Sequence, residues 1–173
     1  MSQRHGTPHS GGQGAAPRPG GQAGAGGGID QLLAKIVFTK DALPAEIFSD
    51  IAEEAARRVK DSGGKDKNTP TQLRRFYDEL VMWNDTVQQE PRDKRKGEYE
   101  KLEPFIKMLK AKVAYAKGRN HVDEDFKKLF SHCINKIDCP DSLKHCKFFM
   151  EAFMGYSKAW EKLGKKESDN VCG

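Results

Sequence analysis

Apolar residues recur at intervals of three and four positions in one segment after another between Ile29 and Leu163. This spacing places them along one face of an α-helix, whereas a half-buried strand needs strict alternation of apolar and polar residues. No segment shows that alternation. We therefore expect an all-α fold, a compact bundle of about five to six helices joined by short loops.

Local start and stop signals divide the chain into its expected helices. Thr69, Pro70 and Gln72 form a capping-box pattern with a proline in the first turn, which is a strong helix start. Pro104 predicts a kink or a break, and Gly118 suits a left-handed helix end. The expected segments are 29–37, a helix from about Pro44 to Val59, Thr69 to Val87, about Glu98 to Gly118, Asp123 to Ile137, and about Asp141 to Leu163.

The two ends of the chain differ in composition from the helical part. Residues 1–28 hold 10 of the 17 glycines and three of the prolines. Such a segment buries too little apolar surface to offset the entropy lost on ordering. The sequence therefore predicts a disordered Gly/Pro-rich tail at 1–28, a helical bundle domain at 29–165 and a flexible C-terminus at 166–173.

Charge and hydropathy limit the class of protein. The net charge is +5, but outside residues 1–28 the balance is 28 basic against 25 acidic residues, so any basic patch must come from placement. No apolar run reaches the roughly 18 residues of a membrane span, and no apolar core of a signal peptide is present. We expect a cytoplasmic protein whose cysteines are free thiols.

The stretch from Lys107 to Arg119 contains no acidic residue and has three helical ridges. They are Phe105, Leu109, Val113 and Ala116 facing the core, Met108, Lys112, Tyr115 and Arg119 beside it, and Lys107, Lys110 and Lys117 on the core's other side. Cations pair with phosphates and an aromatic ring stacks on bases, so the pattern favours a polyanion-binding surface. The alternative is a solvated charged face with one boundary tyrosine.

Catalytic and metal-binding patterns are weak. The sequence has no Gly-rich phosphate loop, no nucleophile elbow and no His-Glu-x-x-His, so we expect no enzyme. A zinc site remains as an alternative, because cysteines and histidines cluster near one helix–loop–helix corner. The gaps between them are irregular, however, whereas zinc sites usually pair ligands two to four residues apart. The candidates are His132, Cys133, Cys139, His145 and Cys146.

Two further features suggest contacts with other molecules. The turn at 118–122 resembles the turn of a helical DNA-binding module, but the next helix opens with acids that would repel a DNA backbone. In the last helix, apolar residues cover well over half the circumference, which indicates a central position or a partner on its second side. Phe148 lies outside that face and is a candidate subunit contact, unless it is an ordinary exposed phenylalanine.

Three blocks of sequence, at residues 69–77, 109–119 and 146–156, resemble a known family in their order and spacing. They are Thr-Pro-Thr-Gln-Leu-Arg-Arg-Phe-Tyr, Leu-Lys-Ala-Lys-Val-Ala-Tyr-Ala-Lys-Gly-Arg and Cys-Lys-Phe-Phe-Met-Glu-Ala-Phe-Met-Gly-Tyr. The family is the small helical subunit of type III-A CRISPR effector complexes, the Csm complex. The match covers roughly 69–163, and its middle block is the most specific.

The resemblance implies a non-enzymatic helical bundle without a cofactor. Several copies would stack head to tail beside the backbone subunits that hold the guide RNA, contact mainly the target strand, and connect to the large signalling subunit. Target cleavage and cyclic oligoadenylate synthesis would belong to those other subunits. The Gly-rich tail departs from the family pattern, so an additional role for it stays open.

The resemblance also implies RNA-binding residues by position. They are Arg74, Lys110, Lys112, Tyr115 and Arg119, with Lys147 as a weaker candidate. Five further cations match no firm family position and are hypothesised to assist electrostatically. They are Arg75 and the four cations of an expected charged loop at Glu90–Gly97, namely Arg92, Lys94, Arg95 and Lys96. Because guide–target pairing supplies specificity, we expect contacts that are independent of sequence. The alternative is a protein-only adaptor whose basic ridges meet an acidic partner.

Overall fold

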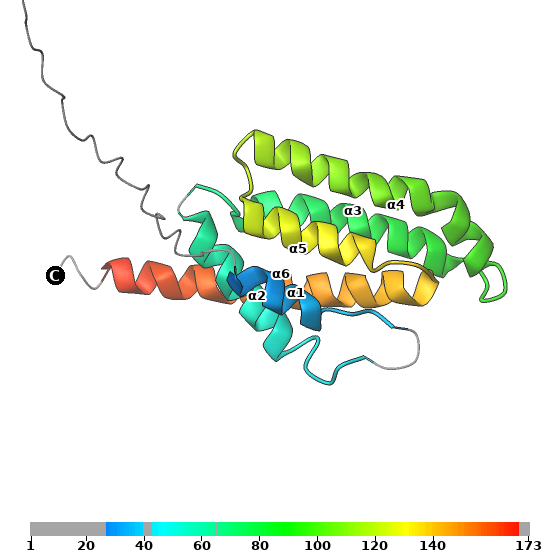
Figure 1. Ribbon diagram of the computed structural model, residues 1–173, viewed down its shortest axis with the longest axis horizontal. Coiled ribbons are helices and arrows are strands. Elements are labelled where there is room, and N and C mark those ends of the chain that lie inside the picture. The colour runs from blue at the N-terminus through cyan, green and yellow to red at the C-terminus, as the bar shows by residue number, and fades with distance from the viewer. Residues whose placement is uncertain (1–26, 40–42, 65, 170–173) are drawn as a thin grey trace, which may run out of the picture.

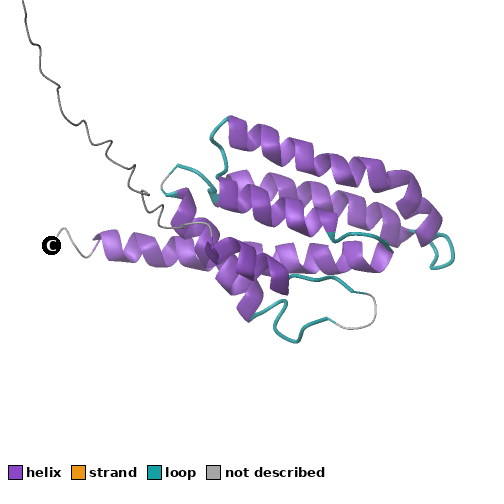
Figure 2. Ribbon diagram, in the orientation of Figure 1, coloured by secondary structure: helices purple, strands orange, loops and turns teal. Residues whose placement is uncertain are grey.

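The computed structural model describes residues 27–39, 43–64 and 66–169, and these contain six helices and no strand (Figures 1 and 2). The predicted all-α fold is therefore confirmed. Most of the predicted tail, together with residues 170–173, lies outside the described residues. The helices are α1 (Gly27–Lys35), α2 (Asp50–Gly63), α3 (Pro70–Gln89), α4 (Arg95–Gly118), α5 (Glu124–Asn135) and α6 (Pro140–Asp169).

Helix α6 is central, because it packs against α2 on one side and α3 on the other, with a smaller contact to α4. Figure 1 shows α4 at the top, α3 and α5 between it and α6, and α1 and α2 overlapping or crossing α6 in this view. The wide apolar face of α6 is thus covered within the chain. Buried rings join these layers: Phe126 of α5 lies 6.1 Å from Phe153 of α6 and 5.6 Å from Phe76 of α3. None of the described helices is both long and apolar enough to span a membrane.

Several helix boundaries follow from the predicted signals. The Thr69 side chain accepts a hydrogen bond from the Gln72 backbone, and the Gln72 side chain accepts one from the Thr69 backbone, so the capping box at α3 is confirmed. Asp123 caps α5 by accepting from the Phe126 N–H at 2.9 Å. The acidic start of that helix is therefore explained by local structure.

The second and last helices differ from prediction at their ends. The expected helix start near Pro44 is wrong, because α2 begins at Asp50. Residues 45–49 form turns, in which the N–H groups of Ile47 and Ser49 donate to carbonyls three residues earlier. Ile47 is buried as predicted, but it lies in these turns and not in the helix. At the other end of the chain α6 continues to Asp169, beyond the expected end at Leu163 and into the segment expected to be flexible.

Helix α4 also departs from prediction in its course. It begins at Arg95 rather than Glu98 and runs unbroken through Pro104, so of the two predicted alternatives, a kink or a break, the break is wrong. Pro104 is solvent-exposed, so the carbonyl that loses its N–H partner there can bond water instead. Gly118 stays helical, and Asn120 takes the left-handed conformation with φ 59°. Asparagine is the residue after glycine that most readily adopts this conformation.

The predicted core ridge of α4 is partly wrong. Phe105 is 49% exposed, and its ring stacks on Trp83 of α3 at 5.9 Å. The buried face is instead Tyr99, Ile106, Leu109 and Val113. These residues are separated by seven, three and four positions, a mixture of spacings that keeps them on one face of the helix. The predicted ridge instead used two successive spacings of four, and each spacing of four rotates the side-chain direction by about 40° around the helix axis.

Candidate RNA-binding surface

Helices α3 and α4 run antiparallel as neighbours and enclose a groove of about 350 Å³. Two pairs set their register: Glu79 bonds Lys112 at the groove, and Trp83 stacks on Phe105 nearer the connecting loop. This register brings one face of each helix to the groove. The lining residues are Gln72, Arg75, Phe76, Glu79, Lys112, Tyr115, Ala116, Arg119 and His121.

Tyr115 and Arg119 form the outer rim where α4 ends. The Tyr115 side chain is the most exposed large apolar residue described, at 67%. The Arg119 guanidinium lies over its ring, 5.9 Å from the centroid, and Nη1 donates to the tyrosine oxygen at 3.4 Å. Among the described residues Arg119 has no carboxylate partner. The cation is therefore held in place by the ring while its charge remains available.

The negative end of the α4 dipole is partly satisfied next to these groups. The left-handed Asn120 turns the chain, so that its N–H donates to Lys117 O at 3.0 Å and the His121 N–H donates to Ala116 O at 3.0 Å. Carbonyls that would otherwise face an approaching anion are thus bonded internally. The end of α4 can therefore accommodate a polyanion at less electrostatic cost.

Lys112 and Arg75 differ in how free their charges are. Lys112 bonds the Glu79 carboxylate across the groove, so this pair contributes little net charge. Arg75 is exposed and has no ion-pair or hydrogen-bond partner in the described part of the chain. Apart from His121, the groove holds three cations against one carboxylate, which leaves two net positive charges.

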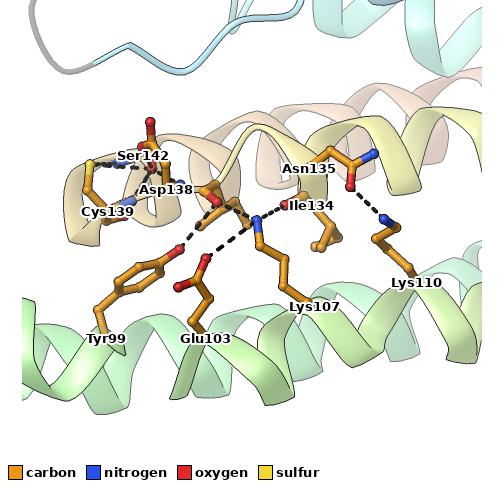
Figure 3. Close-up of polar contacts among 10 residues, drawn as sticks. Tyr99, Glu103, Lys107, Lys110, Ile134, Asn135, Asp138, Cys139 and Ser142 are labelled. Atoms are coloured by element: carbon orange, nitrogen blue, oxygen red, sulfur yellow. Dashed lines mark hydrogen bonds and ion pairs between the residues drawn. The ribbon is translucent and has the colours of Figure 1, made fainter. Parts of the chain in front are cut away.

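The third predicted ridge is a structural seam rather than a free surface (Figure 3). Lys107 Nζ donates to Ile134 O at 3.0 Å and Ile137 O at 2.5 Å, where α5 ends, and burial lowers the pKa of this lysine. Lys110 donates to Asn135 Oδ1 at 2.7 Å, and Lys117 lies 3.4 Å from Glu124. Lys107 and Lys110 thus join α4 to the C-terminal end of α5, and Lys117 joins it to the N-terminal end. All three lie on the side of α4 that faces away from the groove.

Arg74 and Lys147 lie on the other flank of α3, beside α6. Arg74 pairs with Asp78 at 3.4 Å, and Lys147 pairs with Glu151 at 2.6 Å. Both groups lie near Tyr77. Burial, followed by the charge of Glu151, raises the pKa of this tyrosine, and the two cations offset only part of the increase. The structure therefore brings Lys112, Tyr115 and Arg119 together but places the other three candidates elsewhere.

The remaining sequence candidates lie on α6 or around the connection between α3 and α4. Phe148 is partly exposed, edge-on to Phe48 at 6.1 Å, with Lys144 and Lys147 over its ring at 5.7 and 4.9 Å. Of the cations predicted to lie in a loop, Arg92 precedes α4, whereas Arg95 and Lys96 belong to its first turn; these three line a second cavity of about 740 Å³ beside the start of α6, and Lys94 is exposed outside it. Arg95 there donates to Glu90 O and Gln88 O at 2.9 Å each, which ties the loop to α4.

The cysteine–histidine cluster is distributed through the fold. Cys133 and Cys146 are fully buried, and burial together with their mutual hydrogen bond raises the pKa of Cys146 well above its ordinary value. His132 Nε2 lies 3.0 Å from Ile36 O, and Cys139 bonds Ser142. The described residues contain no group of three or more such side chains placed to hold a metal ion; Cys172 lies outside them.

The α3 side of the groove is only weakly marked in the sequence. Gln72 is predicted only as part of a helix cap, Glu79 and His121 are not among the predicted RNA-binding residues, and Arg75 matches no firm family position. The signal present in the sequence was that Arg75 and Glu79 are four residues apart and thus share a helix face. Only the pairing of α3 with α4 shows that this face meets Lys112 and Tyr115.

The comparison with known families agrees with this architecture. The family model described as Csm2 Type III-A matches residues 43–162, which is most of the chain and spans α2 to α6 almost entirely. No curated protein and no solved structure matches the chain. Members of this family are non-catalytic structural subunits that associate with the other Csm subunits and the CRISPR RNA. The chain belongs to the Csm2 Type III-A family, the small subunit of the type III-A CRISPR Csm complex.

Proposed function

We propose that this subunit contacts the sugar–phosphate backbone of the target RNA, in its duplex with the guide, through the groove between α3 and α4. The observation that carries the proposal is the convergence of Arg75, Lys112 and Arg119 with the exposed Tyr115 on one surface. Phosphates pair with guanidinium and ammonium groups regardless of base sequence. Such contacts suit a particle in which guide–target pairing supplies specificity.

Binding by one copy is expected to be weak. Two net positive charges in the groove release about two counterions, which gives a modest affinity with a shallow salt dependence. Several copies stacked along the backbone subunits would present this groove repeatedly to one strand, so that many small contacts add through effective concentration. We expect this assembly to act in the cytoplasm.

The candidates outside the groove have subordinate roles in this proposal. Arg74 and Lys147 lie on the α3–α6 flank, where each already has an acidic partner, and Lys110 bonds Asn135. They would add long-range attraction rather than direct phosphate contacts. Phe148, which is partly exposed and has two lysines over its ring, is proposed as a contact with another subunit.

Titration of the purified full chain with a short unstructured RNA at several salt concentrations tests the proposal. The plot of log K against log salt should have a slope of about −1.4, because each of two free cations contributes about −0.7 on a single strand. Arg119→Ala should make the slope shallower by about 0.7. The matched control is Arg57→Ala, on α2, whose arginine pairs with Asp61 away from the groove. A protein-only adaptor would show no salt-dependent RNA binding.

A further inference from the structure

We propose that the α3–α4 groove is a binding site for a single unstacked nucleobase of the bound RNA, and not only a place where phosphates rest. This inference rests on the proposed RNA-binding function and adds a ligand class and a stacking residue to it. The groove's floor, its outer wall and its size each support a base rather than backbone alone.

The floor of the groove is apolar and rigid. Phe76 lines it while only 8% exposed, and its ring is packed against Phe126 at 5.6 Å and Phe130 at 5.3 Å in the core. Ala116 of α4 also lines the groove, and its small side chain takes up little of the space. A phosphate gains nothing from an apolar floor, because it would lose hydration there without a compensating bond. A flat aromatic base gains by covering it.

The outer wall is an aromatic ring presented to solvent. Tyr115 is 67% exposed, and Arg119 restrains it through the ring contact at 5.9 Å and the hydrogen bond to its oxygen. A tyrosine ring and a guanidinium plane are the two side-chain surfaces on which bases stack in single-strand binding proteins. A base entering the groove would therefore meet a stacking surface that is already ordered.

The other polar residues that line the groove include both hydrogen-bond donors and acceptors. The Glu79 carboxylate accepts bonds, and Lys112 and Arg75 donate them, so amino and carbonyl groups of any base find a partner. The positive net charge of the groove complements the phosphate attached to the base. The site should thus accept all four bases, with differences set by stacking strength.

The volume decides how much of the RNA fits. About 350 Å³ is at the lower end of the range of roughly 300–1,000 Å³ typical of small-ligand pockets. It has room for one base with part of its ribose, and not for a base pair. The occupant is therefore a base that is unpaired or turned out of the guide–target duplex.

Abasic RNA separates base binding from backbone binding. The full chain is titrated, by fluorescence anisotropy at fixed salt, with an oligouridine and with an oligoribonucleotide of the same length in which every base is absent. The wild-type chain should bind the oligouridine about five- to tenfold more tightly, at the lower end of what aromatic stacking on one base contributes. Tyr115→Ala should remove this ratio, and so should Ala116→Leu, which fills the groove while leaving all its cations in place.

Two controls make the outcome specific. Phe148→Ala deletes another partly exposed ring, outside the groove, and should keep the ratio unchanged. Equal affinity of the wild-type chain for both RNAs, with normal salt dependence, would overturn the base site and leave the proposed function intact. An absence of binding to either RNA would overturn both. A ratio that survives in Tyr115→Ala and Ala116→Leu would likewise overturn the site, because the base would then be bound elsewhere.

Discussion

Glu79 is the one acidic side chain that lines the groove, and replacing it by glutamine should tighten RNA binding. In the native chain its carboxylate bonds Lys112 and neutralises that cation. An incoming phosphate must compete with this carboxylate. Glu79→Gln removes the competitor while keeping the size and hydrogen-bonding capacity of the side chain, so Lys112 becomes free to pair with RNA.

The magnitude follows from counterion release. One more free cation should steepen the salt dependence on a single strand by about 0.7, from about −1.4 to about −2.1. At 0.1 M salt this corresponds to a gain in affinity of about fivefold. The cost in folding should be small, because Lys112 is 45% exposed and such pairs contribute about 0–1 kcal/mol. Isothermal titration or anisotropy at four or five salt concentrations measures both quantities.

A matched control separates the groove from a general change in charge. Glu54→Gln on α2 also removes one negative charge and also frees a cation, Arg58, from a pair at 2.7 Å. Its helix, α2, packs against α6, α1 and α5 and is separate from α4 in Figure 1. Equal effects of Glu79→Gln and Glu54→Gln, or an unchanged slope in Glu79→Gln, would refute the reasoning.

Two further predictions concern the frame that holds the groove. Asn68 is buried at φ 56°, donates to Val59 O and accepts from the Asp123 N–H, so Asn68→Ala should lower the free energy of unfolding in urea by about 2–4 kcal/mol. Asn68→Gly tolerates the backbone angle and should cost less; an equal cost would contradict the assigned strain. Burial raises the pKa of Tyr99 above its ordinary 10.0, so above pH 10 the unfolded state ionises first and stability falls by about 1.4 kcal/mol per pH unit. Tyr99→Phe should lack this component of the pH dependence, and parallel curves for the two proteins would exclude it.

The parts of the fold that were predictable from sequence depend on local physics. The capping box at Thr69 and the acidic helix start at Asp123 need only neighbouring residues, and both are present in the structure. Phe105 shows the limit. It shares a helix ridge with Leu109, yet its ring lies on the surface against Trp83, because the partner helix rather than the ridge decides which side is buried.

In the candidate site, too, the packing of the helices decides what the local sequence cannot. Lys107 and Lys112 are alike in sequence and lie within two turns of one helix, but one bonds carbonyls at the end of α5 and the other faces the groove. Arg74 and Arg75 are adjacent, yet only Arg74 has an acidic partner on its own helix. Helical periodicity separates such residues by angle, and only the packing of α3, α4 and α5 assigns each angle to a neighbour or to solvent.

Target-RNA retention by the assembled type III-A complex tests the central claim most directly. The complex is reconstituted with Lys112→Ala/Arg119→Ala chains or with Arg57→Ala/Lys128→Ala chains, which lose the same charge on α2 and α5. Dissociation of labelled target RNA is then measured at matched subunit occupancy. The groove variant should release target RNA faster than the wild type, and the control should not. Equal release rates from all three complexes would contradict the assignment of RNA binding to the α3–α4 groove.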